Sequence, residues 1–183
     1  MLKLLKIVNK AGRATTQYPF GPAGFTSSFR GKPEYDPKQC IACGACANAC
    51  PPNALTIETN IEDGTRTWQL FVGRCIYCGR CDEVCPTRAI ELRQNFELAV
   101  AAKEDLFETA IFRLCRCQKC ERPFAPQKEV DYALAITAQA MGVEGDTSVL
   151  RAQFETCPEC KRRAGISTGV RYLPDARSNE ERQ

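Results

Sequence analysis

The feature that most constrains this chain is a cysteine pattern that occurs twice within residues 39–92. Each copy reads C-x2-C-x2-C-x3-C-P, and the offset between the copies, from Cys40 to Cys75, is 35 residues. The similarity continues beyond the cysteines, because residues 51–57 (PPNALTI) align with residues 86–92 (PTRAIEL). This internal duplication predicts an α+β domain with pseudo-twofold symmetry, in which each half supplies a ligand loop, a short helix and a short strand.

The spacing of the cysteines is typical of bacterial ferredoxins that hold two [4Fe–4S] clusters, where the fourth cysteine of each run ligates the cluster of the other run. Eight thiolates at this doubled spacing, each run followed by Pro, argue against the alternative of two zinc sites. Only uncharged residues separate the first four cysteines, whereas charged residues and Tyr77 separate the second four, so we expect inequivalent clusters without knowing the sign of the difference. Crossed ligation predicts one [4Fe–4S] cluster on Cys40, Cys43, Cys46 and Cys85, and the other on Cys75, Cys78, Cys81 and Cys50.

Composition narrows the chemistry, because the 183 residues include 13 cysteines and no histidine. The absence of histidine excludes Cys2His2 zinc fingers, Rieske clusters, His-ligated haem, zinc proteases and nucleophilic catalysis by Ser–His or Cys–His pairs. A net charge of +3 gives no reason to expect a nucleic-acid partner. We therefore expect cysteine–metal chemistry and no catalytic site of the chain's own.

The sequence contains no run that approaches the ~18–20 apolar residues needed to span a bilayer. Residues 1–25 do not resemble a secretory signal either, because Lys6 and Lys10 interrupt any apolar region and no small-x-small cleavage site follows. We expect the chain to stay in the reducing cytosol, where clustered cysteines bind metals rather than form disulfides.

The first 35 residues predict an amphipathic helix followed by an extended docking arm. Residues 1–13 have helical periodicity, with Lys and Arg on one face and Leu, Ile and Val on the other. This helix could pack on its own domain, dock on a partner subunit or rest at a membrane surface, and we favour a partner because one short helix is a weak membrane anchor. Residues 16–37 are rich in Gly, Pro and Ser but carry aromatic residues, which indicates an arm that wraps a neighbouring subunit.

The cluster domain is expected to span residues 36–93. Within it, alternating residues on both sides of Glu62-Asp63-Gly64 predict a β-hairpin. Trp68 lies in the second strand of this hairpin, and we expect it to shield a cluster or the core. At the other end of the chain, residues 174–183 are polar and predict a disordered tail.

Residues 94–173 form a C-terminal extension with a predicted metal site of its own. Two C-x2-C knuckles provide enough thiolates for a tetrahedral site of Zn²⁺ or rubredoxin-like iron, and they argue against a redox dithiol or a third cluster. We expect helices over residues 103–110, over 129–141 with Gly142 at the end, and near 148–154. The predicted ligands are Cys117, Cys120, Cys157 and Cys160, which leaves Cys115 as a spare cysteine.

The tandem motifs, the segment FRGKP at residues 29–33, and CERPFAPQK at 120–128 with CPECK at 157–161 together resemble one family. It is the ferredoxin-type iron–sulfur subunit of bacterial formate hydrogenlyase complexes, of the hydrogenase-4 component H type. Its cluster domain is similar to that of the subunit of respiratory complex I with two [4Fe–4S] clusters. The resemblance covers nearly the whole chain up to about residue 173, and it implies an electron-transfer subunit that relays electrons from formate oxidation toward a [NiFe] hydrogenase.

The resemblance also implies the partners of the chain. They would be the small and large subunits of the hydrogenase and a ferredoxin-like electron donor subunit, without nucleic acid. The chain would be peripheral on the cytoplasmic face of the inner membrane, attached indirectly through those subunits. The alternatives are a free dicluster ferredoxin or a complex I-type iron–sulfur subunit, and the intact cysteine pattern argues against a zinc-knuckle regulatory protein.

Overall fold

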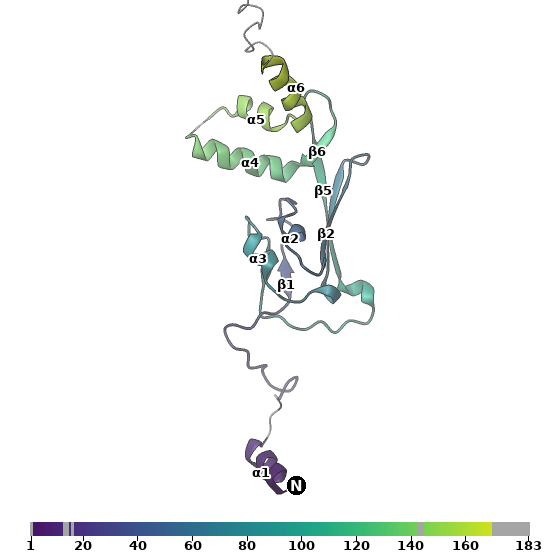
Figure 1. The fold of residues 1–183 in the computed structure, drawn as a ribbon, viewed down its shortest axis with the longest axis vertical. Coiled ribbons are helices and arrows are strands. Elements are labelled where there is room, and N and C mark those ends of the chain that lie inside the picture. Colours follow the sequence, from purple (N-terminus) through teal and green to yellow (C-terminus); the bar gives the residue numbers. More distant parts are fainter. Residues whose placement is uncertain (1, 13–14, 16, 143–144, 170–183) are drawn as a thin grey trace, which may run out of the picture.

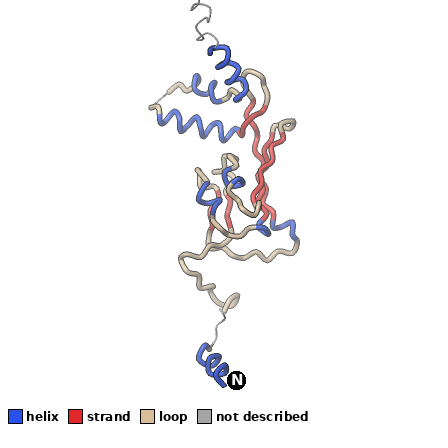
Figure 2. The backbone as a smooth tube through the Cα atoms, viewed as in Figure 1, coloured by secondary structure: helices blue, strands red, loops and turns tan. Residues whose placement is uncertain are grey.

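The structure is a computed structural model that describes residues 2–12, 15, 17–142 and 145–169. The longer helices are α1 (Leu2–Ala11), α4 (Gln127–Ala140), α5 (Ser148–Phe154) and α6 (Pro158–Gly169), and the short ones are α2 (Ala45–Asn48) and α3 (Arg80–Val84). The described chain is elongated, with α1 at the N-terminal end, the strands and the short helices α2 and α3 in the middle, and α4, α5 and α6 at the opposite end (Figure 1; Figure 2). Within the described ranges no helix is long and apolar enough to cross a membrane. The tail predicted to be disordered, residues 174–183, lies outside the described residues.

The duplicated cysteine pattern folds into two antiparallel strand pairs. Strand β1 (Pro33–Tyr35) pairs with β4 (Ile90–Leu92), and β2 (Leu55–Asn60) pairs with β3 (Thr65–Phe71). Each pair joins the strand that leads into one cysteine run to the strand that follows the other run. The registers also correspond, because Tyr35 lies opposite Ile90 and, at the same 35-residue offset, Leu70 lies opposite Leu55.

The backbone repeats its unusual turns at the same offset. Ala42 and Tyr77 have φ of 57° and 55°, and Gly44 and Gly79 both have φ of 82°. Each glycine directly precedes a short helix, α2 (Ala45–Asn48) or α3 (Arg80–Val84), and glycine adopts this left-handed conformation without a steric cost.

The predicted hairpin is confirmed. Strands β2 and β3 pair from Leu55 opposite Leu70 to Asn60 opposite Thr65. The turn is held by the Asn60 side chain, whose Oδ1 accepts hydrogen bonds from two main-chain N–H groups of the loop, and by Gly64 with φ of 64°.

The predicted helix over residues 103–110 is wrong. Only Lys103–Leu106 forms a short 3₁₀ turn, and strand β5 (Phe107–Arg116) then pairs with β3 along seven residues. The reason is the pairing with β3, which outweighs local helix propensity, and farther along β5 Phe112 and Leu114 are buried while Ile111 and Arg113 are exposed. Strand β6 (Pro123–Pro126) adds to β5, so the extension completes a sheet of order β2-β3-β5-β6 with the cluster domain.

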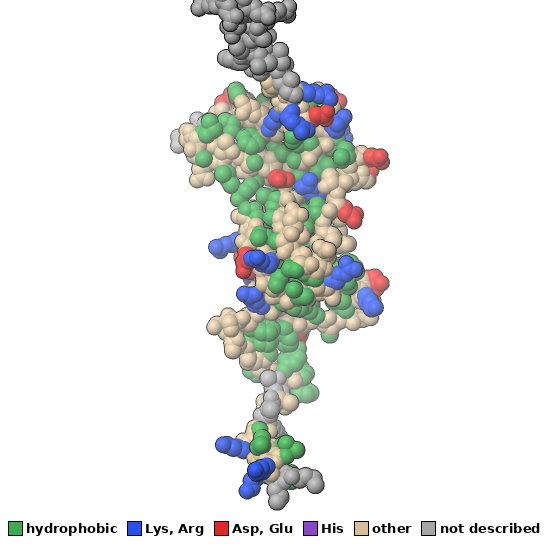
Figure 3. Space-filling model, in the orientation of Figure 1, with side chains coloured by type: hydrophobic (Ala, Val, Ile, Leu, Met, Phe, Trp, Pro, Cys, Tyr) green, Lys and Arg blue, Asp and Glu red, His purple; other side chains and the backbone are tan. Residues whose placement is uncertain are grey.

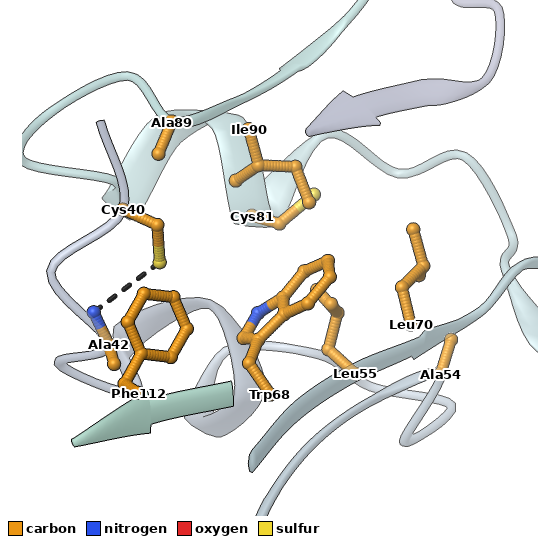
Figure 4. Packing of buried hydrophobic residues seen from close by; sticks show 10 residues of the cluster. All are labelled: Cys40, Ala42, Ala54, Leu55, Trp68, Leu70, Cys81, Ala89, Ile90 and Phe112. Carbon is orange, nitrogen blue, oxygen red and sulfur yellow. Dashed lines mark hydrogen bonds between the residues drawn. The ribbon is translucent and has the colours of Figure 1, made fainter. Parts of the chain in front are cut away.

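The core lies between this sheet and the β1–β4 pair. Figure 4 shows the Trp68 indole in the middle of it, near Phe112, Leu55 and Ile90. Trp68 is 1% exposed, which confirms the expectation that it is buried. Two cysteines of the repeat, Cys40 and Cys81, belong to the same buried cluster, so the metal-ligand candidates are part of the core itself.

Two helices of the extension, α4 and α5, agree with the predictions for residues 129–141 and 148–154, whereas α6 was not predicted. Helix α4 follows β6 directly, buries Val130 and Leu134, and stops before Gly142, whose φ is 64°. Helix α5 packs beside α4, as Figure 1 shows, and α6 begins at the second cysteine knuckle.

The predicted N-terminal helix is present as α1, and its apolar face has no partner among the described residues. Leu4, Leu5, Ile7 and Val8 are between 58% and 67% exposed. Figure 3 shows apolar and basic side chains of α1 side by side, apart from the rest of the molecule. Among the described residues the helix therefore does not pack on its own domain, and docking on a partner subunit stays a prediction.

The arm is attached to its own chain more closely than expected. Phe25 stacks on Phe29 and meets Phe96 edge to face, with ring centroids 4.2 and 4.7 Å apart. A Cβ at Gly31 would collide with the main-chain oxygens of Arg93 and Asn95, so glycine is needed where the arm passes this segment. Two aromatic rings of the arm, Tyr18 and Phe25, thus pack on Phe96 beyond the cluster domain, whereas Phe20 is 99% exposed.

Candidate metal centres

Two cavities lie in the cluster domain, and four cysteines line each of them. Cys40, Cys43, Cys46 and Cys85 line the first cavity. Cys50, Cys75, Cys78 and Cys81 line the second cavity. These are the two sets that crossed ligation requires, so the structure brings each predicted set together. The ligation itself stays a prediction.

The strand pairing explains the crossing. Cys85 lies just before β4, and β4 pairs with β1, the strand that leads into the first cysteine run. In the same way Cys50 lies just before β2, which pairs with the strand that leads into the second run. The pairing therefore carries the fourth cysteine of each run to the loop of the other run.

Main-chain N–H groups point at cysteine sulfurs in both cavities. In the first, Ala42 donates to Cys40 Sγ at 3.3 Å, the dashed line in Figure 4, and Ala89 donates to Cys85 Sγ at 3.2 Å. In the second, Tyr77 donates to Cys75 Sγ at 3.4 Å. Such donors stabilise the negative charge of metal-bound thiolates. Four thiols around each cavity, with amide donors behind them, fit a [4Fe–4S] cluster.

Side chains add donors at the first cavity. Trp68 Nε1 donates to Cys46 Sγ at 3.4 Å, and its ring stacks on Tyr35 with centroids 3.7 Å apart. The Tyr35 hydroxyl is buried, and burial and the neighbouring Cys40 thiol raise its pKa well above the ordinary value. The Thr87 hydroxyl lies 3.7 Å from Cys85 Sγ.

The surroundings of several of these cysteine thiols disfavour the deprotonated, thiolate form. Burial raises the pKa of Cys81 to about 12, and it also raises the pKa values of Cys46 and Cys75. Burial acts in the same direction on Cys85, but hydrogen bonds from Thr87 and Ala89 outweigh it and lower the pKa of that thiol. Binding of iron would release the protons of these buried thiols, because only thiolates ligate the metal.

Basic residues outside the two copies of the cysteine pattern hold both ligand loops in place. The sequence patterns did not predict these contacts. Arg66 Nη1 donates to the carbonyl oxygen of Ala42 at 3.0 Å, and Arg30 Nη1 donates to that of Cys78 at 2.7 Å. Lys128 Nζ, at the start of α4, donates to the carbonyl oxygens of residues 37 and 38 at 2.8 and 3.1 Å. The only available signal was that Arg30 and Lys128 lie in the segments that carry the family resemblance.

The extension brings its own four cysteines together. The sulfur atoms of Cys117, Cys120, Cys157 and Cys160 all lie within 4.8 Å of one another. The Cys120 and Cys157 sulfurs are 3.7 Å apart, close to the separation of about 3.8 Å that a tetrahedral zinc site with Zn–S bonds of about 2.3 Å implies. Cys115 lies outside the group, buried on β5.

The environment of these four sulfurs favours a bound cation. The main-chain N–H of Cys157 donates to Cys117 Sγ at 3.3 Å, and this bond is the main cause that lowers the pKa of Cys117 to about 6. Hydrogen bonding to Cys157 and then to Cys120 raises the pKa of Cys160 to about 12. One thiolate is thus available near neutral pH, while at least one neighbour holds its proton until a metal displaces it.

Residues 39–89 match the family of 4Fe-4S dicluster domains. With two four-cysteine cavities in that segment, the chain is an iron–sulfur protein of the dicluster class. It is also 52% identical over 164 residues to formate hydrogenlyase subunit 6 of Escherichia coli (strain K12), and the alignment covers 88% of this chain and 89% of that protein. The chain therefore belongs to the formate hydrogenlyase subunit 6 family.

Two other similarities cover less of the chain. NADH-quinone oxidoreductase subunit I of Francisella tularensis subsp. tularensis (strain WY96-3418) is 39% identical over 75 residues, which cover 36% of this chain and 46% of that protein. A chain in the structure of the membrane-bound sulfane sulfur reductase, an archaeal respiratory membrane complex, is 29% identical with a TM-score of 0.41. That match covers 56% of this chain and 55% of the other. These similarities add no residue to the candidate sites.

Proposed function

We propose that the chain is an electron-transfer subunit of a membrane-bound formate hydrogenlyase, which passes electrons toward the small subunit of a [NiFe] hydrogenase. Oxidation of formate to CO₂ and a proton releases two electrons, and reduction of two protons to H₂ consumes them, so the subunit is left unchanged after each turnover. Clusters supply one-electron chemistry when they are bound. The chain itself provides ligands, spacing and docking surfaces rather than a catalytic site.

The observation that carries this proposal is the pair of cysteine-lined cavities in a chain that is 52% identical to formate hydrogenlyase subunit 6 over almost its whole length. Under the proposal, Cys40, Cys43, Cys46 and Cys85 hold one [4Fe–4S] cluster. Cys75, Cys78, Cys81 and Cys50 hold the other, and the two halves form a pseudo-twofold domain, as the matched registers and turns suggest.

The four cysteines of the extension would hold one mononuclear metal, zinc or rubredoxin-like iron. The short sulfur–sulfur separations support this assignment. The position of the site between the loop after β5 and the start of α6 supports a structural role, because the metal would connect two segments about forty residues apart in sequence.

Helix α1 would dock on a partner subunit. Its leucine, isoleucine and valine side chains are exposed on a helix that the rest of the described chain does not cover. A free dicluster ferredoxin would have no use for this surface or for the extension. Hydrogenase subunits and a ferredoxin-like donor subunit are the proposed partners, and they would hold the chain on the cytoplasmic face of the inner membrane.

Anaerobic purification of the native complex through a tag on this chain tests the proposal. Elemental analysis should give about eight iron atoms and one zinc, or about nine iron atoms and no zinc, per chain. Hydrogenase subunits should co-elute with the chain. Elution as a small monomer from fresh extract would contradict the assignment to a complex.

The docking role of α1 has a matched pair of variants. Leu5→Ser with Val8→Ser should reduce co-purification of partner subunits, because these substitutions remove exposed apolar surface. The control, Lys3→Ser with Lys6→Ser on the basic face of the same helix, should retain them. If both double variants kept or lost the partners equally, docking through the apolar face would be wrong.

A further inference from the structure

The two cluster cavities are built from equivalent positions of the repeat. Apart from Leu92, every residue that lines the second cavity has a counterpart in the first at the 35-residue offset. For example, Ile41 in the first cavity corresponds to Ile76 in the second, and Ala89 in the first to Ala54 in the second. The two cavities can thus be compared position by position, and only the side chains that differ can account for a difference between the two clusters.

Five of the equivalent positions differ in hydrogen-bonding capacity: two of them, Tyr77 opposite Ala42 and Arg80 opposite Ala45, place a donor at the second cavity, and three place a donor at the first. The first cavity carries Trp68, Tyr35 and Thr87, each with an N–H or O–H group. At the corresponding positions of the second cavity stand Pro33, Leu70 and Pro52, whose side chains have no donor.

The three donors of the first cavity are directed at its cysteines or buried beside them. Trp68 Nε1 lies 3.4 Å from Cys46 Sγ, and Thr87 Oγ1 lies 3.7 Å from Cys85 Sγ. The Tyr35 hydroxyl is buried at the same cavity and has no hydrogen-bond partner among the described residues. Its ring is fixed by stacking on Trp68, with 12° between the planes. A buried donor without a partner is costly, so this hydroxyl fits a cavity that holds sulfur acceptors.

The two donor side chains of the second cavity are not directed at its cysteines in the described structure, because Arg80 Nη1 donates to Glu83 Oε2 at 3.0 Å and the Tyr77 hydroxyl makes no hydrogen bond to a cysteine. Each cavity receives a main-chain N–H on its first cysteine, at 3.3 and 3.4 Å, and an arginine on a carbonyl oxygen of its loop. The second cysteine run also carries Asp82 and Glu83 against Arg80, a local excess of one negative charge. Negative charge near a cluster disfavours its reduction.

We propose that the cluster held by Cys40, Cys43, Cys46 and Cys85 has the higher reduction potential, and that Trp68, Tyr35 and Thr87 set the difference. Reduction adds negative charge to the cluster, and hydrogen bonds to its sulfur ligands stabilise that charge. This inference rests on the proposed function, because it requires that both cavities hold clusters. Electrons that enter the subunit would therefore reside mainly on the first cluster.

Redox titration of the loaded full-length chain, followed by electron paramagnetic resonance, tests the proposal. Trp68→Phe, Tyr35→Phe and Thr87→Val each remove a donor and keep most of the side-chain volume. Each should shift the higher of the two midpoint potentials to a more negative value and leave the lower one in place. The triple variant should bring the two potentials closer together. A hyperfine coupling to an exchangeable proton should disappear in Trp68→Phe.

The matched control is Tyr77→Phe, which removes a hydroxyl at the second cavity that makes no hydrogen bond to a cysteine among the described residues. It should leave the higher potential unchanged. The proposal is overturned if the donor variants move the lower potential, or if they move neither potential. Iron content separates this failure from that of the proposed function: with about eight iron atoms bound, only the assignment of potentials is wrong, whereas without iron the proposed function itself fails.

Discussion

The two cysteine-rich regions of the molecule use their cysteines differently. In the cluster domain the cysteines belong to the hydrophobic core, where Cys40 and Cys81 pack in one buried cluster with Trp68. In the extension Cys117 and Cys157 are also buried, but they lie outside this core cluster, and Cys120 beside them is exposed. Under the proposed function, iron would replace part of the core in the first region, whereas a metal in the second would join the loop after β5 to the start of α6.

The largest effect is expected from a cysteine of the core. Cys85→Ala should remove at least half of the bound iron and markedly lower the thermal unfolding midpoint, because it leaves a cavity with three ligands in the middle of the fold. Metal analysis and circular dichroism of the anaerobic protein measure both effects. Cys115→Ala is the control, since that cysteine lies outside all three groups. Full iron content in the Cys85→Ala variant would show that Cys85 is not required to hold a cluster in the core.

A smaller and local effect is expected in the extension. Cys160→Ser should cost the single mononuclear metal and leave about eight iron atoms in place. Hydrogen exchange should become faster in α6, because that helix begins at the metal knuckle, and should not change in β2 and β3. A parallel loss of iron from the cluster domain would contradict the distinction between a core metal and a peripheral one.

The peripheral site should also depend on pH. The Cys160 thiol, with a pKa of about 12, must lose its proton when a metal binds, whereas Cys117, with a pKa of about 6, is already a thiolate at pH 7.5. Lowering the pH from 8 to 6 should therefore weaken zinc binding, by at least about tenfold per pH unit for each proton released. Competition with a zinc indicator measures this. An affinity independent of pH would mean that these thiols do not ligate the metal.

The smallest effect tests the contact between the two regions. Lys128→Met removes two hydrogen bonds from α4 to the loop that precedes Cys40, and we expect a local loss of about 1 kcal/mol. Hydrogen exchange of the amides of residues 38–41 should become faster while metal content is unchanged. Lys161→Met, which loses only a contact with the Phe154 ring in the extension, should not affect that loop.

The parts of the fold that depend on local patterns could be predicted from the sequence. The Asp-Gly turn, the helix that ends at Gly142 and the grouping of the cysteines all follow from residue spacing. Strand β5 could not be predicted in this way, because Phe107–Arg116 becomes a strand by pairing with β3, which lies about forty residues earlier. Pairing of this kind outweighs local helix propensity.

The same limit applies to the candidate sites. Spacing predicted which cysteines belong together, but not that Arg66 and Lys128 hold the first ligand loop, since these contacts depend on how distant segments pack. The order of the two reduction potentials could likewise not be predicted from the sequence. It depends on the strands β3 and β1, which place Trp68 and Tyr35 at the same cavity.

The crossed strand pairing has a consequence for how the protein is made. Each cavity is lined by residues from both halves of the repeat. A nascent chain that ends before residue 75 therefore lacks a complete set of the four cysteines that line either cavity. The second set is completed when Cys81 emerges from the ribosome, and the first only four residues later with Cys85. With crossed ligation, as proposed, both sites would thus become available to the assembly machinery almost simultaneously, at the end of the repeat.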